Sequence, residues 1–336
     1  MKRNKKKIDV EAFVSGEIKR TTKLIQPKKK IPFVVTHHGK NIHLIETSSP
    51  LMTKFEQNFL LLSDVHFDNP SCNRAILSKL LREAVEKNAV IISCGDFLDL
   101  MQGKGDPRAD KATLRSSLLS AAYFDRVIDE TADYLCSDET NCAATHMAVL
   151  AEGNHESAWL KHRESDPTVH LARALKSRCN TQVEAGGYHG YIKLQVKIGT
   201  KGFQHTGLTI KYHHGSGGGG MSGGVLDARR MFTWVDADII ISGHNHASNL
   251  VGVQREVLSS QNGIFQIKQK YCEFIRIGTL KDEWHPSGWA VERGGYPMPC
   301  VQKWLRVFGN YEQVFSKNEN RTRSAQRLNW EVTDAR

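Results

Sequence analysis

Apolar runs and helix-like patterns alternate along the first half of the sequence. Short, almost continuously apolar segments at 59–63, 89–93 and 147–151 have the length and composition of buried β-strands. Between the first two, residues 75–87 place apolar side chains at helical spacing, which predicts an amphipathic helix. We expect further helices at 114–135 and at 157–176, the second with a break at Pro167.

The second half of the sequence changes character after residue 188. Shorter strand-like segments separated by turns follow there, at 191–198, 208–212, 237–241, 249–257, 264–268 and 274–277. A strand–helix alternation followed by a strand-rich half predicts an α/β fold, with two packed mixed sheets flanked by helices. Near the N-terminus, two apolar segments flank Gly39-Lys40 and predict a hairpin, with the sequence His37-His38-Gly39 at its tip.

Positive charge is concentrated in the first thirty residues. Residues 1–30 contain 11 Lys or Arg and 3 Asp or Glu, a net charge of +8, which leaves +2 of the chain's +10 for residues 31–336. We therefore expect a near-neutral body with a basic, flexible arm. Such an arm favours polyanions, namely nucleic acid, an anionic membrane surface or an acidic partner; the alternative is a solvated tail.

The composition excludes several classes of protein. With 336 residues, of which 40% are hydrophobic and 24% charged, the chain is typical of a globular protein. No apolar run approaches the ~18 residues of a membrane-spanning helix, and no signal-peptide segment follows the basic N-terminus, so we expect a cytoplasmic protein without a membrane span. The 7 Cys include no C-x-x-C pair, which favours reduced thiols over disulfides or a cysteine-based zinc site.

Polar residues suited to metal binding follow each of five predicted strands. Because ligands and catalytic groups in α/β folds lie where strands end in loops, we expect these residues to share one site. They are Asp64 and His66; Asp96 and Asp99; Asn154 and His155; His213 and His214; and His244 and His246.

The chemical types in this set indicate a metal centre. Asp64 with His66, and His244 with His246, are spaced two residues apart, which on a regular strand places both side chains on one face. Imidazole nitrogens together with carboxylate oxygens suit Mn, Fe, Zn, Ni or Co, and a set without Cys is not a structural zinc site. The ligands are too many for one ion, which predicts two ions sharing a bridging carboxylate.

The ordered series D-x-H, G-D-x-x-D, G-N-H-E, H-G and G-H-x-H resembles the calcineurin-like metallophosphoesterase superfamily, over about residues 59–280. The resemblance implies an αββα sandwich with two divalent ions at the strand ends, for which we expect Mn²⁺. It also implies hydrolysis of a phosphoester bond by a hydroxide that the two ions activate. By position, it assigns Asp64, His66 and His246 to the first ion, Asn154, His214 and His244 to the second, Asp96 to the bridge, His155 to catalysis at the leaving group, and Asp99 to the orientation of His155.

The resemblance also suggests how the chain is divided. We expect the basic arm at 1–30, a hairpin extension at 31–57, the metallophosphoesterase domain at 58–310 with an insertion at about 100–145, and a polar C-terminal tail at 311–336. The superfamily uses the His directly before Gly as a ligand, which favours His214 over His213.

Three functions are compatible with these motifs. The basic arm favours a phosphodiesterase or nuclease, which would hold nucleic acid beside the metal centre. The alternative is a phosphomonoesterase acting on a nucleotide or another small phosphorylated metabolite. The third is a non-catalytic scaffold on the same fold, although no ligand is missing. Protein Ser/Thr phosphatases of the superfamily have Arg where this chain has Leu100, which disfavours a protein substrate.

Several segments offer groups that could bind the phosphate of the substrate. The Gly-rich stretch at 215–224 follows a predicted ligand, and it either presents backbone N–H groups to phosphate oxygens or forms a mobile loop over the site. Beyond it, Arg229 and Arg230 are candidate substrate-binding residues. The basic residues after the G-N-H-E motif, Lys161, His162 and Arg163, are a second candidate set.

Overall fold

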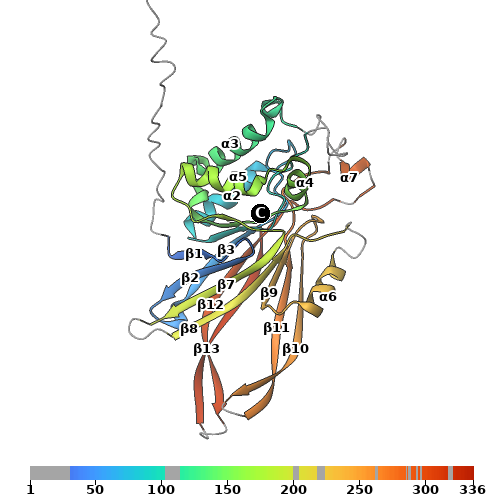
Figure 1. Cartoon of the computed structure of the whole chain (residues 1–336). Coiled ribbons are helices and arrows are strands. Elements are labelled where there is room, and N and C mark those ends of the chain that lie inside the picture. The colour runs from blue at the N-terminus through green and yellow to red at the C-terminus, as the bar shows by residue number, and fades with distance from the viewer. Residues whose placement is uncertain are drawn as a thin grey trace, which may run out of the picture.

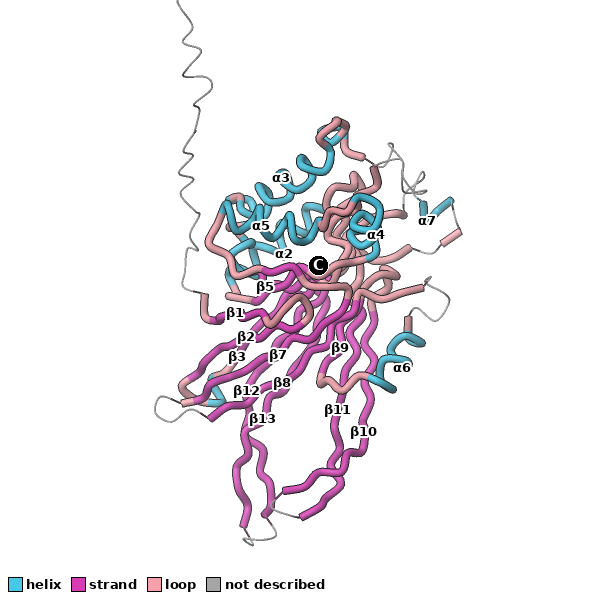
Figure 2. The backbone as a smooth tube through the Cα atoms, in the orientation of Figure 1, coloured by secondary structure: helices cyan, strands magenta, loops and turns pink. Residues whose placement is uncertain are grey.

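Two mixed β-sheets form the centre of the chain, with helices against their outer faces (Figures 1 and 2). The computed structural model describes residues 31–102, 114–199, 204–217, 224–261, 264–284, 286, 289–292, 294–295, 297–316 and 321–336. The six-stranded sheet has the order β13 (Arg321–Ala335), β12 (Gln302–Ser316), β3 (Glu56–Leu62), β4 (Val90–Ser93), β5 (Met147–Leu150) and β6 (Glu184–Ala185). The seven-stranded sheet has the order β1 (Phe33–His37), β2 (Ile42–Ser49), β7 (His189–Ile198), β8 (Gln204–His213), β9 (Ile239–Ser242), β11 (Ile264–Arg276) and β10 (Asn249–Gln261).

The helices are divided between the two sheets. Helices α2 (Arg74–Glu86), α3 (Tyr123–Cys136) and α5 (Pro167–Arg178) contribute buried side chains to the core on the outer face of the six-stranded sheet. Helix α6 (Val225–Trp234) packs on the seven-stranded sheet. Helix α4 (Asn154–Arg163) follows β5, and the short α7 (Trp289–Glu292) precedes β12. This is the predicted α/β architecture of two mixed sheets flanked by helices.

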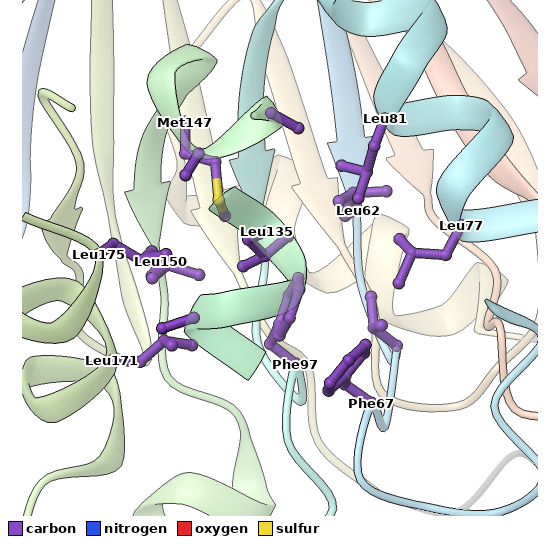
Figure 3. Packing of buried hydrophobic residues seen from close by; sticks show 14 of the residues in the cluster. Leu62, Phe67, Leu77, Leu81, Phe97, Leu135, Met147, Leu150, Leu171 and Leu175 are labelled. Carbon is purple, nitrogen blue, oxygen red and sulfur yellow. The ribbon is translucent and has the colours of Figure 1, made fainter. Parts of the chain in front are cut away.

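Alternate residues of the buried strands face two different cores. In β3, Phe59 and Leu61 pack between the two sheets, whereas Leu60 and Leu62 pack against the helices. Because both faces of the strand are buried over residues 59–62, this part is wholly apolar and shows no polar alternation. Figure 3 shows the helix-side core, which includes Leu77 and Leu81 of α2, Leu135 of α3, Met147 and Leu150 of β5, and Leu171 and Leu175 of α5.

Parallel strand pairs bring five strand ends together. Strands β3, β4 and β5 run parallel in one sheet, and β8 and β9 run parallel in the other. The segments that follow them contact one another through the backbone. The N–H of Asp64 donates to the carbonyl of Gly95 at 3.1 Å, and the N–H of Gly243 donates to the carbonyl of His214 at 2.9 Å. The sequence motifs after these five strands therefore lie side by side.

The observed helices match most of the predicted ones. Helix α2 coincides with the expected segment, and the side chain of Asn73 caps it by accepting a hydrogen bond from the N–H of Ile76. The expected break at Pro167 separates α4 from α5, whose N-terminus Asp166 caps. Helix α3 begins at Tyr123, later than expected, since a 3₁₀ turn, η3 (Ser116–Leu118), precedes it.

The strand-rich half contains longer strands than the sequence pattern predicts. Strand β11 covers both of the segments expected at 264–268 and 274–277, because the polar residues between them stay paired with β10. The N-terminal hairpin is confirmed as β1 and β2, and β2 also runs parallel to β7. The segment at 31–57 is therefore an integral part of the seven-stranded sheet.

Residues 311–336 contribute to the six-stranded sheet, which corrects the prediction of a polar C-terminal tail. Strand β12 lies between β3 and β13 and pairs with β3 from Lys303 to Phe308. Charged side chains obscured this pattern, since Arg306 forms ion pairs with Glu56 and Glu331 across the three strands. The edge strand of this sheet is β13, and charges on an edge strand discourage pairing with other chains.

Several expectations concern residues outside the described part of the chain. The basic arm at 1–30 and the central part of the Gly-rich stretch, 218–223, both lie there, as do residues 103–113 of the expected insertion. The described remainder of that insertion includes α3 and contributes to the helix-side core. Among the described residues, no helix is both long enough and apolar enough to cross a membrane.

Candidate metal centre

The predicted ligands gather into two adjoining clusters where the five strands end. In each cluster, one ligand atom from every residue lies within 4.8 Å of the others. We call the set Asp64, His66 and His246 the first cluster, and the set Asp96, His214 and His244, with Asn154, the second cluster. The structure therefore brings together all seven residues that the sequence motifs predict as metal ligands.

The first cluster contains buried polar atoms that have no hydrogen-bond partner within the described structure. They are Asp64 Oδ1 and His66 Nε2. His246 Nε2 lies 3.5 Å from Asp64 Oδ1, while the other carboxylate oxygen, Oδ2, accepts hydrogen bonds from Ser63 Oγ at 2.6 Å and from the N–H of His244 at 2.9 Å. A buried carboxylate oxygen and imidazole nitrogen without partners are costly unless a cation binds between them. This donor set fits a divalent first-row metal.

In the second cluster, the amide oxygen of Asn154 lies between two imidazoles. It is 2.7 Å from His244 Nδ1 and 3.1 Å from His214 Nε2, and Asp96 Oδ2 lies 3.2 Å from the same His214 Nε2. His214 Nδ1 lies 2.8 Å from the carbonyl of Cys94, so a proton on Nδ1 is donated there and Nε2 is left for a metal. The neighbouring His213 points elsewhere, since its Nδ1 accepts the N–H of Gly215 at 2.9 Å.

The second cluster is electrostatically prepared for a cation. Burial alone would lower the pKa of His214, yet the negative charge of Asp96 raises it to about 9. Burial likewise opposes ionisation of Asp96, but His214 and His155 hold its pKa well below the usual range. The cluster therefore favours positive charge beside Asp96, and a bound metal ion would supply it in place of a proton.

Five of the predicted ligands adopt left-handed backbone conformations. Their φ angles lie between 48° and 80°, a region that residues other than Gly rarely occupy. Strand β3 ends at Leu62 and β9 at Ser242, so the D-x-H and G-H-x-H pairs are brought together by tight turns beyond the strands and not by the strand pleat that we expected. Strained backbone of this kind is concentrated at functional sites. The five residues are Asp64, His66, Asp96, His244 and His246.

Two glycines of the motifs are required by close packing against the ligands. A Cβ atom on Gly243 would lie 1.8 Å from Ser63 Oγ and 2.5 Å from Asp64 Oδ2. A Cβ atom on Gly153 would lie 2.0 Å from Asp96 Oδ1. Side chains at these positions would displace the carboxylates of both clusters.

Comparison with known proteins agrees with this geometry. A family model described as calcineurin-like phosphoesterase matches residues 57–248. The chain belongs to the calcineurin-like phosphoesterase family. It is therefore a hydrolase of phosphoric esters, from a family that typically binds two divalent metal ions.

Solved structures with similarity to this phosphoesterase share little sequence with it. One is a conserved uncharacterized protein of Streptococcus pneumoniae, described as a predicted phosphoesterase, with 12% identity over 82% of this chain and 99% of that chain and a TM-score of 0.30. Another is GAP50, described as the anchor in the inner membrane complex of Plasmodium, with 13% identity over 81% of this chain and 89% of that chain and a TM-score of 0.36. No curated protein matches the chain significantly.

His155 of this phosphoesterase lies beside the second cluster. Its backbone N–H donates to Asp96 Oδ1 at 2.9 Å, and its Nε2 lies 3.9 Å from Asp96 Oδ2. Its Nδ1 lies 2.5 Å from the backbone carbonyl of Asp99 but 3.7 Å from the Asp99 carboxylate. The carboxylate is closer to His66, whose Nδ1 lies 2.8 Å away. Asp99 therefore contacts His155 mainly through its carbonyl group, whereas its side chain is directed at a predicted metal ligand.

Two residues that the sequence analysis did not identify, Lys281 and Glu283, also contact the phosphoesterase site. Lys281 Nζ lies 3.3 Å from Asp99 Oδ1 and 3.0 Å from Glu283, which in turn lies 3.4 Å from His246 Nδ1. Burial opposes ionisation of Glu283, but His246 and Lys281 lower its pKa to about 2. Nothing in the sequence marks this pair, because Lys281 and Glu283 follow the last motif and resemble ordinary surface charges.

The Glu of the G-N-H-E motif connects two ligand-bearing segments of the phosphoesterase. The buried Glu156 carboxylate accepts backbone hydrogen bonds from Asp96 at 3.1 Å, Leu98 at 3.0 Å and Gly153 at 2.9 Å. These bonds fix the loop after β4 against the start of α4. Its position three residues after a helix N-cap is a capping signal that the sequence does contain.

The two arginines predicted to bind substrate, Arg229 and Arg230, are exposed on α6. Within the described structure, no hydrogen bond or ion pair joins either of them to a cluster residue. A shallow, solvent-open pocket lies instead beside His155, between α4 and the loop after β4. It is lined by Leu100, Gln102, His155, Ala158, Trp159, His162 and Arg163.

Proposed function

We propose that this phosphoesterase cleaves phosphodiesters, with Mn²⁺ in both clusters and nucleic acid as its class of substrate. The observation that supports this most directly is the pocket beside His155. Its lining includes Trp159, whose indole stacks on Phe124, and the Arg163 guanidinium lies 5.6 Å from the centre of the indole ring. The cation suits a phosphate of the substrate, and the aromatic pair gives an adjoining nucleoside an apolar surface to contact.

The chain's own residues would orient the substrate and protonate the leaving group. Two divalent ions bound in the clusters would activate a water molecule and neutralise charge on the phosphate. The backbone bond to Asp96 and the Asp99 carbonyl hold His155 at two points, which leaves Nε2 directed away from the carbonyl. As an imidazolium, His155 would donate its Nε2 proton to the departing oxygen, a contribution of roughly 10²–10⁴-fold in rate.

Mn²⁺ is the metal that we favour for this donor set. The two clusters combine carboxylate, amide and imidazole groups without a thiolate, and such ligands suit Mn²⁺ better than metals that select soft sulfur. The absence of an Arg at the position of Leu100 supports a substrate other than phosphoprotein, since Leu100 is buried in the helix-side core. The basic arm at 1–30 would add affinity for nucleic acid.

The test compares Mn²⁺-dependent hydrolysis of bis-p-nitrophenyl phosphate and p-nitrophenyl phosphate, with Asp96→Asn as the blank. We expect the diester to turn over faster, and His155→Ala to bind metal normally but lose about 10²–10⁴-fold in kcat. Higher turnover of the monoester would replace our proposal with a phosphomonoesterase. Metal-loaded protein that hydrolyses neither compound would favour the scaffold.

A matched pair of variants tests the pocket itself. Arg163→Gln should weaken cleavage of a single-stranded oligonucleotide through KM, because it removes the cation beside Trp159. Arg173→Gln makes the same change at an exposed position of the next helix, α5, and should have no effect. Equal effects of the two substitutions would show that the pocket does not bind the substrate.

A further inference from the structure

Three of the seven cysteines meet in the helix-side core, apart from the two clusters that carry the phosphoesterase activity. Cys136, Cys142 and Cys179 are buried and reduced, and their three sulfur atoms all lie within 4.8 Å of one another. The sulfurs of Cys136 and Cys179 are 3.5 Å apart. No described Asp, Glu or His atom of the active site belongs to this group. The trio forms a separate set of soft ligands.

We propose that Cys136, Cys142 and Cys179 bind one zinc ion, which holds the helical layer together. With Zn–S bonds of about 2.3 Å, a tetrahedral site places its sulfurs about 3.8 Å apart. The observed spacing is compatible with that value after only small movements. A disulfide would need about 2.05 Å between two sulfurs and would leave the third thiol without a role.

The three cysteines are presented by three different elements. Cys136 is the last residue of α3, and Cys179 is the C-cap of α5, one turn after Leu175. Cys142 is the N-cap of a 3₁₀ turn, η5 (Ala143–His146). Because the ligands come from separate elements, the sequence shows no C-x-x-C signature, and the sequence analysis found no reason to expect a cysteine site.

The backbone at Cys142 is held in a conformation that turns the chain sharply. Cys142 has a φ of 55°, and Asn141 before it has a φ of 54°, so two successive residues other than Gly are left-handed. Left-handed residues other than Gly are strained and persist where the surrounding structure requires them. Here the turn brings the Cys142 sulfur to the other two thiols. A bound ion would compensate for the strain of the turn.

Cysteine binds zinc as the thiolate, so zinc binding by the trio would release the protons of its thiols. Thiolate ligands select Zn²⁺ over the harder ions that suit the two oxygen- and nitrogen-rich clusters.

His146 is available for the fourth coordination position. It is buried, and its Nε2 has no hydrogen-bond partner among the described residues. Its Nδ1 lies 3.0 Å from Thr145 Oγ1, and a neutral imidazole can bind a metal through the other ring nitrogen. It lies four residues after Cys142, and its nitrogen would have to approach the sulfurs by a change of side-chain rotamer.

Spectroscopy of the full chain with Co²⁺ tests the proposal without relying on activity. Cobalt bound to thiolates gives a strong near-ultraviolet charge-transfer band, which oxygen and nitrogen ligands in the dinuclear centre do not produce. We expect one such site per chain in the reduced protein, and its displacement by one equivalent of Zn²⁺. No thiolate band in folded, reduced protein would overturn the proposal.

Cysteine variants identify the ligands. Cys142→Ser should abolish the cobalt–thiolate band while retaining phosphoesterase activity. Cys272→Ser removes an equally buried thiol outside the trio, in the core beneath α6, and should keep the band. Loss of the band in Cys272→Ser, or its persistence in Cys142→Ser, would contradict the assignment.

Discussion

Replacing Asp99 by Asn separates two roles that its position suggests. The substitution removes the charge of the side chain but keeps the backbone carbonyl, which lies 2.5 Å from His155 Nδ1. The carboxylate lies 2.8 Å from His66 Nδ1 and also accepts a hydrogen bond from Asn69 at 2.8 Å. We therefore expect the change to act on metal binding through His66 and to leave His155 in place.

The expected magnitude follows from the position of the carboxylate behind a metal ligand. Loss of such a partner typically weakens metal binding by about 10–100-fold, or about 1.4–2.7 kcal/mol. The first cluster should lose affinity by this amount, whereas the second cluster should change little because Asp99 does not contact its residues directly. At saturating Mn²⁺, kcat should remain close to that of the wild type.

Equilibrium competition with a fluorescent chelator measures the Mn²⁺ affinity of each site, and steady-state kinetics at saturating metal measure kcat. Asp133→Asn, on the exposed face of α3, makes the same chemical change away from the site and serves as the control. A large fall in kcat at saturating metal, with unchanged affinity, would refute this reasoning. It would mean that the carboxylate acts on His155 despite the longer distance of 3.7 Å.

Two further predictions follow from packing and from burial. Gly243→Ala should prevent metal binding in the first cluster, because the new methyl would lie 2.5 Å from Asp64 Oδ2; normal metal stoichiometry by mass spectrometry under native conditions would contradict this. Burial lowers the pKa of His43 from 6.5 to about 4. As the pH falls through this range, His43 takes up a proton in the unfolded state before it does so in the folded state. The free energy of unfolding therefore falls by up to about 3 kcal/mol. His43→Gln should remove that part of the pH dependence in urea unfolding, and an equal loss of stability in both proteins would argue against it.

The gathering of ligand-type side chains could be predicted from the sequence because each group is marked locally. Each motif lies within a few residues of a buried apolar strand, so a pattern such as Gly243-His244-Asn245-His246 gives both the ligand types and their position at a strand end. Even the choice of His214 over His213 follows from the adjacent Gly215. The family match over residues 57–248 rests on the same segments.

Features that depend on distant contacts were not predictable in the same way. The polar composition of β13 masks its pairing with β12, because its charges are satisfied across strands. Lys281 and Glu283 acquire their role only when the chain after β11 returns to Asp99 and His246. The contact of the Asp99 carboxylate with His66 was not predicted either, because spacing alone does not tell which imidazole a carboxylate faces.

The position of β12 beside β3 has a consequence for the order in which the protein assembles. The N–H of Ser63, next to the predicted ligand Asp64, donates to the side chain of Gln302, which lies 239 residues further along the chain. At typical rates of synthesis this interval lasts roughly 10–50 s. During that time the edge of β3 has no neighbour on one side, and the carbonyl of Asp64 also awaits Thr279 and Leu280. The first motifs are therefore synthesised long before the sheet around the predicted metal centre is complete. A metal ion or a chaperone that binds the nascent chain in this interval would meet an incomplete sheet.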